Sequence, residues 1–320
     1  MSPQLPVELT APTGLRQAWQ YVTWPVWNHD HHRLRAPFRA IIPVIATFLA
    51  LAIVQSVVRS QFEHPVRESA EMIGIAGVLI GAVLVSSRLI DRRPATEYGL
   101  SFNRQWLQMF AVGGLAATLI NAGAVAVGLG AGWVTVAGIV QTPGVISFLP
   151  AMVVVFGYIM VAGLWEEFIF RGVLLKNIAE GVNGYVRNEI AIGIALAINC
   201  IVFAFLHGGK VTHLSHYGYY LLAGLVLGGV YVLTGELALS MGFHIFYNYT
   251  QSAVFGLGVS QQTPELLVLN LVGPTQYIGE EGLVHVGATA VGGLLLLGYV
   301  YWMDGELRIH DCLTRWTSTV

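Results

Sequence analysis

Apolar runs long enough to cross a lipid bilayer constrain the fold of this chain more than any other feature of its sequence. About 20 consecutive apolar residues span the hydrocarbon core of a bilayer as a helix. Eight such runs can be counted in the 320 residues, at 37–58, 71–87, 107–129, 146–174, 189–206, 217–233, 237–257 and 284–303. We therefore expect an all-α, polytopic integral membrane bundle of about eight transmembrane helices.

The composition agrees with this fold class and narrows the possible partners. Hydrophobic residues make up 55% of the chain and charged residues 11%, whereas a soluble domain carries about 25% charged residues. The lipid bilayer is therefore the first expected partner. A net charge of -2 offers no basic field, so nucleic acid is not expected as a partner. The two cysteines, Cys200 and Cys312, lie too far apart in the sequence to indicate a disulfide framework.

The positive charges orient the eight spans, because cytoplasmic loops of membrane proteins carry an excess of Lys and Arg. On an even-span arrangement, thirteen of the 16 Lys and Arg residues fall on one side. The other side holds only Arg59, Arg67 and Lys210. We expect both termini to be cytoplasmic in a plasma membrane protein. The loop 260–283, which lacks Lys and Arg, is then outside, and we expect 266–272 to dip into the membrane interface.

Three ionisable residues lie inside the fourth apolar run, where charge is costly and usually has a function. Successive helical residues turn by roughly 100°. Glu167 and Arg171 are four residues apart, so they share a helix face and can form an ion pair. Glu166 lies about 100° away from Glu167 and is poorly placed for the same partner. We expect Glu167 to be neutralised by Arg171 and Glu166 to be free to act as a base.

Histidines and an asparagine add polar chemistry to two further spans. Phe203 and His207 lie four residues apart at the end of the fifth span. In the seventh span, His244 and Asn248 share one face of an otherwise apolar or aromatic helix. Burying an imidazole and a carboxamide together is costly without a purpose. His285 is expected at a membrane interface.

These residue types together suit the hydrolysis of an amide bond. A carboxylate can take a proton from water, and imidazole and amide donors can hold an oxyanion. Alternatively, Glu166, His207 and His244 could be ligands to a divalent metal such as zinc that activates the water. The chain contains no HExxH, no GxSxG elbow and no GxxxxGK[ST] phosphate loop, which makes other protease and nucleotide chemistries less suitable.

Three motifs in this order resemble those of a known family. The first is EExxxR, from Glu166 to Arg171. The second is FxxxH, from Phe203 to His207, and the third is HxxxN, from His244 to Asn248. The sequence is similar over about 156–260 to the CPBP family, also called the CAAX protease and bacteriocin-processing or Abi family, which includes the Ras-converting CAAX prenyl endopeptidases.

The resemblance implies roles for these residues in an intramembrane endopeptidase of the glutamate type. It implies that Glu166 activates the attacking water, that His207 assists at the water, and that His244 and Asn248 bind the oxyanion. Glu167, Arg171 and Phe203 would support them. The glutamate mechanism requires no cofactor, although a divalent metal stays an alternative. The expected partner is a membrane-associated or CAAX-like protein or peptide substrate.

On this reading the chain has four parts. A polar cytoplasmic tail covers 1–36, and N-terminal transmembrane helices cover 37–145. A CPBP-like catalytic transmembrane core covers 146–260. An outer loop, the last span and a cytoplasmic tail cover 261–320. A non-catalytic immunity or transport protein is the alternative function, but a transporter would be expected to show inverted repeats or paired broken helices.

The expected spans place Glu166 and His207 at different depths in the membrane. Glu166 lies eight residues, or roughly 12 Å, above the cytoplasmic end of a span that stops at residue 174. His207 would reach the outer end of a straight helix starting at residue 189. We therefore expect part of 179–195 to lie along the membrane interface rather than across the bilayer.

Overall fold

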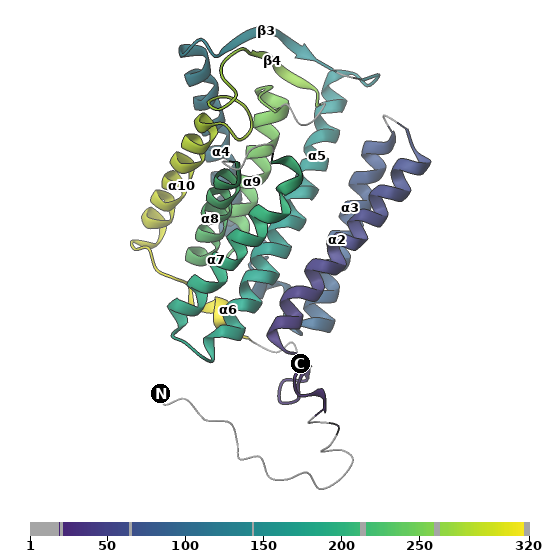
Figure 1. Ribbon diagram of the computed structural model, residues 1–320, viewed down its shortest axis with the longest axis vertical. Helices are drawn as coiled ribbons and strands as arrows, with labels where there is room; N and C mark the ends of the chain where they lie inside the picture. Colours follow the sequence, from purple (N-terminus) through teal and green to yellow (C-terminus); the bar gives the residue numbers. More distant parts are fainter. Residues whose placement is uncertain are drawn as a thin grey trace.

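The computed structural model is a bundle of helices capped at one end by a small sheet (Figure 1). It describes residues 19, 22–63, 66–142, 144–211, 216–258 and 263–316, so most of the expected tail 1–36 lies outside the described residues. The long and medium helices are α2 (Ala36–Gln61), α3 (Val66–Val85), α4 (Arg104–Gly130), α5 (Phe148–Glu167), α6 (Lys176–Asn183), α7 (Asn188–Leu206), α8 (His216–Thr234), α9 (Ala238–Tyr249) and α10 (Leu283–Asp304). The expected all-α membrane bundle is confirmed.

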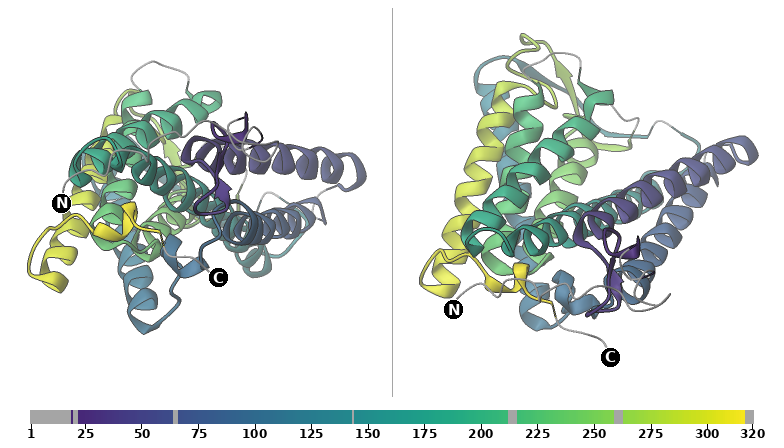
Figure 2. Two further views of the ribbon diagram at one scale, coloured as in Figure 1. Left: turned by 90° about the horizontal axis from the view of Figure 1, so that it is seen from below. Right: turned by 60° about the horizontal axis from the view of Figure 1, so that its bottom comes forward.

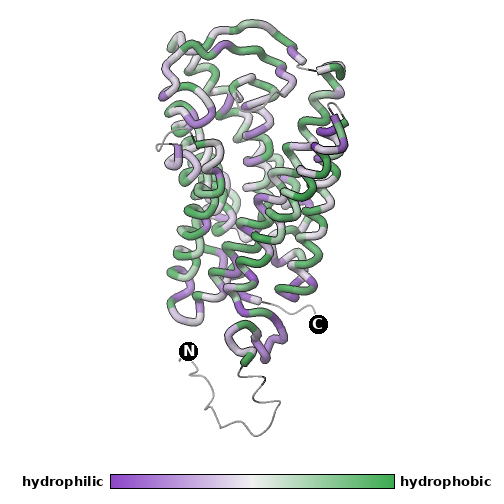
Figure 3. The backbone as a smooth tube through the Cα atoms, turned by 45° about the vertical axis from the view of Figure 1, so that its right-hand side comes forward, coloured by the Kyte–Doolittle hydropathy of each residue, from purple (hydrophilic) through white to green (hydrophobic). Residues whose placement is uncertain are grey.

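Seven helical segments of the described chain are long and apolar enough to cross a membrane. They correspond to seven of the eight runs seen in the sequence. The eighth run, 237–257, forms the 12-residue α9, which continues into the five-residue π-helix η5 (Thr250–Val254). Hydrophobic residues predominate along the helices, and hydrophilic residues gather toward the ends (Figure 3).

The helix that carries Glu166 is longer than expected. After α5 the chain continues through the π-helix η3 (Phe168–Leu175) into α6, so that Phe148–Asn183 forms one 36-residue span. The expected end of this span at residue 174 is therefore wrong. Glu166 and His207 lie at comparable distances along their helices from the α6–α7 turn at 184–187. The apparent difference in depth between them disappears for this reason, and the expected interfacial position of part of 179–195 stays a prediction.

The short helix α9 lies at the centre of the bundle because α4 approaches it backbone to backbone. A Cβ atom added at Gly242 would lie 2.0 Å from the carbonyl oxygen of Phe110, and one at Gly113 would lie 2.3 Å from the carbonyl oxygen of Leu239. Small residues allow such close contact between membrane helices. The helices α2 and α3 pair with each other and lie along one side of the bundle (Figure 2).

One end of the bundle is capped by two antiparallel strands, β3 (Val134–Gln141) and β4 (Glu265–Leu271). Val134 pairs with Leu271, and Gln141 pairs with Glu265. Residues 266–271, which belong to the segment expected to dip into the membrane interface, thus lie in β4, and the depth of 266–272 in a membrane stays a prediction. Pairing with β3, a segment rich in β-branched residues, gives hydrogen-bond partners to backbone N–H and C=O groups that would have none in a single extended segment.

A buried ionic network lies at the opposite end of the bundle, near the short strands β1 (Trp27–Asn28) and β2 (Arg33–Leu34). Glu180 of α6 accepts hydrogen bonds from Nη2 of Arg39 at 2.8 Å and from Nη2 of Arg93 at 2.6 Å, and it also pairs with Arg33. Nε1 of Trp316 donates to the carbonyl oxygen of Asp91. The network joins the first span, the α3–α4 connection, α6 and the C-terminal segment.

Candidate active site

The residues of the three motifs meet around one cavity in the middle of the bundle. Its volume is about 100 Å³. Glu166 enters it from the end of α5, His207 from the C-terminal cap of α7, and His244 and Asn248 from α9. Four residues that are up to 82 positions apart in the sequence thus face one space.

Glu167 is fully buried and lies at the centre of an ion pair and a hydrogen bond. Its Oε1 accepts from Nη1 of Arg171 at 3.0 Å and from Nδ1 of His244 at 2.8 Å. Glu167 and Arg171 both have 0% of their side-chain surface exposed. The ion pair expected from their spacing is therefore present. The bond to His244 was not foreseen from the sequence, and it gives the second glutamate a defined contact with the third motif.

Glu166 has a different environment, as the helical geometry predicts. Its Oε2 lies 3.9 Å from Nε2 of His207 and 3.8 Å from Nε2 of His244. Both separations are too long for direct hydrogen bonds and leave room for a bridging water. This oxygen is buried and has no hydrogen-bond partner within the described part of the chain. Glu166 is thus a carboxylate that faces two imidazoles, and no Lys or Arg in the described part of the chain pairs with it.

The ring of His207 is held in one orientation by its own helix. Nδ1 of His207 lies 2.7 Å from the carbonyl oxygen of Phe203. Because a carbonyl only accepts, Nδ1 carries the hydrogen and Nε2 is directed toward Glu166. The Phe203 ring packs 4.4 Å from the His207 ring, and the Arg171 guanidinium lies 4.4 Å from the centre of the Phe203 ring on its face. The Phe203 ring therefore packs against both the buried Arg171 guanidinium and the His207 ring.

Asn248 lies one helical turn after His244 on α9, and its exposed side chain lines the cavity. The four-residue spacing places both side chains on the same helix face. Asn199, on the same face of α7 as Phe203, does not join them. Its Nδ2 donates to the carbonyl oxygen of Phe170 at 2.7 Å, and the residue is fully buried. Asn199 therefore ties α7 to η3.

The cavity also includes residues that sequence reasoning missed. The Tyr220 ring of α8 stacks on the His207 ring at 4.6 Å and 25°. Its hydroxyl donates to Oε1 of Glu281 at 2.8 Å, and Glu280 lines the same space. A tyrosine in an apolar run and two glutamates in a loop give no distinguishing signal in a single sequence. His285, expected at a membrane interface, lies in the first turn of α10 and is fully buried in the protein.

No group of three or more His, Cys, Asp or Glu side chains in the described residues has an arrangement that could hold a metal ion. Around a tetrahedral zinc ion, nitrogen and oxygen donors would stand about 3.3 Å apart. The corresponding separations from Glu166 to the two histidines are wider, at 3.8 and 3.9 Å. Both free cysteines lie outside this cavity.

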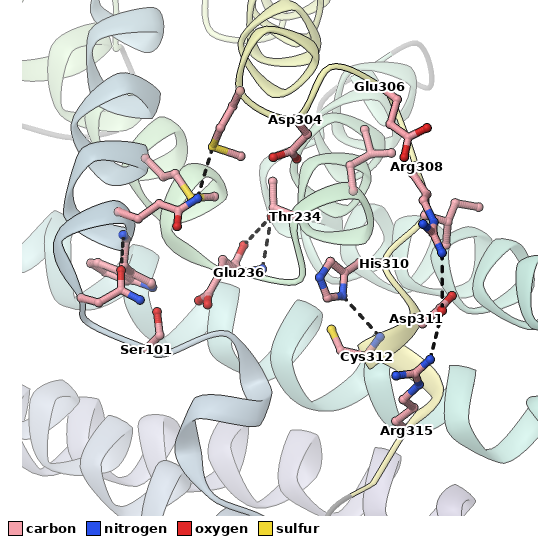
Figure 4. A pocket seen from close by; sticks show the side chains of 17 residues that line it. Ser101, Thr234, Glu236, Asp304, Glu306, Arg308, His310, Asp311, Cys312 and Arg315 are labelled. Carbon is pink, nitrogen blue, oxygen red and sulfur yellow. Dashed lines mark hydrogen bonds and ion pairs between the residues drawn. The ribbon is translucent and has the colours of Figure 1, made fainter.

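A second and larger cavity, of about 580 Å³, opens near the C-terminal segment (Figure 4). Glu236, His310 and Cys312 are among its lining residues, and no residue of the three motifs is. Burial raises the pKa of the Glu236 carboxyl and of the Cys312 thiol. Although this cavity is larger, it is not the candidate active site, because Glu166, His207 and His244 do not line it.

The fold and the cavity together define a multi-pass membrane protein with a carboxylate and two imidazoles inside its helical bundle. Residues 148–250 match the family profile described as Type II CAAX prenyl endopeptidase Rce1-like. This segment contains all three motifs, so the resemblance to the CPBP and CAAX protease family is confirmed there. No curated protein and no solved structure matches the chain.

Proposed function

We propose that this protein is an intramembrane endopeptidase that hydrolyses peptide bonds of membrane-associated or CAAX-like protein substrates. One observation supports this most strongly. Of two adjacent glutamates, Glu167 is neutralised by Arg171 and bonded to His244, whereas Glu166 faces the cavity between two histidines. Such a division leaves one fixed orienting carboxylate and one available general base.

The proposed reaction begins with a water held between Glu166 and Nε2 of His207. Glu166 takes a proton from this water as the water oxygen attacks the carbonyl carbon of the substrate. The carbonyl electrons move to the oxygen, where Nδ2 of Asn248 donates a hydrogen bond. When the C–N bond breaks, the proton on Glu166 passes to the departing nitrogen, which leaves a carboxylic acid and an amine.

His244 is the second proposed oxyanion donor. Its Nδ1 already donates to Glu167, so donation from Nε2 as well requires the imidazolium form. The fixed bond to Glu167 orients the ring in the manner of a histidine held by a carboxylate in other hydrolases. The alternative expected from the sequence is a divalent metal held by Glu166, His207 and His244, which would supply a Lewis acid for water activation. It would require these side chains to approach one another more closely than the 3.8 and 3.9 Å separations found here.

The proposed setting is the plasma membrane, with both termini in the cytoplasm. The excess of Lys and Arg on one side of the bundle supports this orientation. The proposed partners are the lipid bilayer and a protein or peptide substrate. The family profile favours a substrate with a CAAX-like end, whether or not it carries a prenyl group.

Purified protein in detergent or liposomes, assayed with a quenched fluorescent peptide, tests this proposal. We expect turnover by the unaltered protein and none by Glu166→Gln, with both remaining folded. Glu189→Gln is the matched control, because Glu189 is exposed in the first turn of α7 and far from the cavity. Equal turnover in Glu166→Gln and the unaltered protein would contradict the proposal and favour a non-catalytic immunity or transport function.

A further inference from the structure

Gln251 lines the candidate active site, although none of the three motifs contains it. It lies three residues after Asn248, at the second position of the π-helix η5, and it faces the same cavity. It also follows His244 by seven residues, a spacing that returns a side chain to nearly the same face of a helix. π-helical turns within α-helices occur frequently at functional sites.

The side-chain amide of Gln251 is buried without a hydrogen-bond partner. Only 7% of the residue is exposed, and Nε2 has no acceptor within the described part of the chain. The hydroxyls of the adjacent Thr250 and Ser252 instead donate to carbonyl oxygens of their own helix, at 2.6 and 2.7 Å. The backbone carbonyl oxygen of Gln251 accepts from the N–H of Leu257 at 2.8 Å. Among these polar groups, only the amide donor of Gln251 is left unsatisfied.

A buried donor without a partner is costly, and native proteins contain few of them. Such a donor is therefore informative when it lines a cavity that holds the groups of a reaction. Nε2 of Gln251 lies in the same cavity as Glu166, His207 and His244. An acceptor supplied by a bound molecule would satisfy it.

The spacing along the helix sets which part of a substrate Gln251 can reach. With a rise of about 1.5 Å per residue, Gln251 lies roughly 4.5 Å beyond Asn248 along the axis. Successive residues of an extended peptide are about 3.3 Å apart. With Asn248 at the scissile carbonyl, as proposed above, Gln251 lies opposite a peptide unit one or two residues away.

We propose that Nε2 of Gln251 donates a hydrogen bond to a main-chain carbonyl oxygen of the substrate, one or two residues from the scissile bond. This bond fixes the register of the peptide in the cavity. The two aliphatic positions of a C-a-a-X end offer no polar side chain, so main-chain groups are the acceptors available there. Main-chain hydrogen bonds give affinity to a bound peptide whatever its side chains are. This inference rests on the proposed peptidase function.

The variant Gln251→Met separates substrate binding from stability. It keeps the length of the side chain and removes the unsatisfied donor. We expect an unfolding temperature that is unchanged or slightly raised, because the free protein loses no hydrogen bond. We expect KM to rise about tenfold with kcat nearly unchanged, because the contact is made in both the ground state and the transition state.

Gln108→Met is the matched control for this substitution. Gln108 is exposed on α4 and does not line the cavity, so its replacement should change neither KM nor the unfolding temperature. A lower unfolding temperature in Gln251→Met together with an unchanged KM would overturn the proposal. That result would show that Gln251 only supports the packing of η5.

The variant Gln251→Glu tests the direction of the hydrogen bond. An ionised carboxylate accepts hydrogen bonds but donates none. Gln251→Glu should therefore bind the substrate no better than Gln251→Met does. A KM for Gln251→Glu equal to that of the unaltered protein would overturn the assignment of Nε2 as the donor.

A binding measurement distinguishes this inference from the proposed function. A fluorescent peptide with a C-a-a-X end is titrated into the full-length Glu166→Gln protein in detergent, and into the same protein that also carries Gln251→Met. We expect a Kd about tenfold higher for the double variant. Absence of turnover by the unaltered protein would contradict the proposed function. Equal affinities of the two variants, including no binding by either, would overturn the role of Gln251 whether or not turnover is found.

Discussion

Oε1 of Glu167 lies 2.8 Å from Nδ1 of His244, although 77 positions separate the two residues in the chain. The same oxygen accepts the hydrogen bond from Arg171. The second glutamate of the first motif is thereby a direct structural partner of the third motif. It links α5 to α9 inside the bundle and orients the imidazole whose other nitrogen faces Glu166.

The first prediction concerns this bond. Glu167→Gln keeps the side-chain shape but removes the negative charge, which leaves Arg171 buried and unpaired. We expect a loss of about 3–5 kcal/mol in stability. Thermal unfolding in detergent measures this, with Glu166→Gln as the matched variant one residue away. An equal loss of stability in both variants would contradict the different roles given to the two glutamates.

The second prediction concerns Asn248 as an oxyanion donor. Removing one such donor typically lowers kcat by about 10²–10³, so Asn248→Ala should have this effect with little change in KM or thermal stability. Asn248→Asp should be no better, because it places an anion opposite the developing negative charge. Steady-state kinetics on both variants provide the check. Full activity in Asn248→Asp would argue instead for an oxygen ligand to a metal.

The third prediction concerns the stack of Tyr220 on His207. Tyr220→Phe keeps the ring but removes the hydroxyl that donates to Glu281. We expect a moderate fall in kcat for Tyr220→Phe and a larger fall for Tyr220→Leu, which removes the stacking ring too. The pH dependence of kcat should shift in the same order if the ring environment of His207 is altered. Identical kinetics in all three proteins would show that the stack only fills space.

The fourth prediction tests the close approach of α4 and α9. Gly242→Ala places a Cβ atom 2.0 Å from the carbonyl oxygen of Phe110, and backbone cannot move aside as a side chain can. Overpacking of this kind costs about 1–3 kcal/mol or more. Gly123→Ala, on α4 with no atom near the added Cβ, is the control and should be tolerated. Unfolding temperatures that are equal for the two variants would contradict the packing described.

The fifth prediction concerns metal removal. On the glutamate mechanism, extensive dialysis against a chelator should leave turnover unchanged, since Glu166 itself takes the proton from water. Adding zinc afterwards should not increase the rate. Metal analysis of the dialysed protein is the necessary control. Loss of activity on chelation, restored by a stoichiometric divalent ion, would favour the metal-dependent alternative.

The sequence by itself determined the fold class and the chemical groups of the site. Membrane spans can be predicted because the backbone N–H and C=O groups of a long apolar run have no water partners in lipid and must form hydrogen bonds with one another within a helix. The pair Glu167–Arg171 was also predictable, because spacing along one helix sets which side chains share a face. The three motifs were recognisable because each covers only five or six consecutive residues of the chain.

Only the tertiary structure decided how the motifs meet and what surrounds them. The Glu167–His244 bond, the Tyr220–His207 stack and the β3–β4 pairing join segments distant in the chain. The helix of Glu166 continues through the π-helix η3 and α6 to Asn183. Glu166 and His207 therefore lie at similar distances along their helices from the α6–α7 turn. Such relationships depend on the packing of one helix against another, for which a periodic pattern in a single sequence contains no signal.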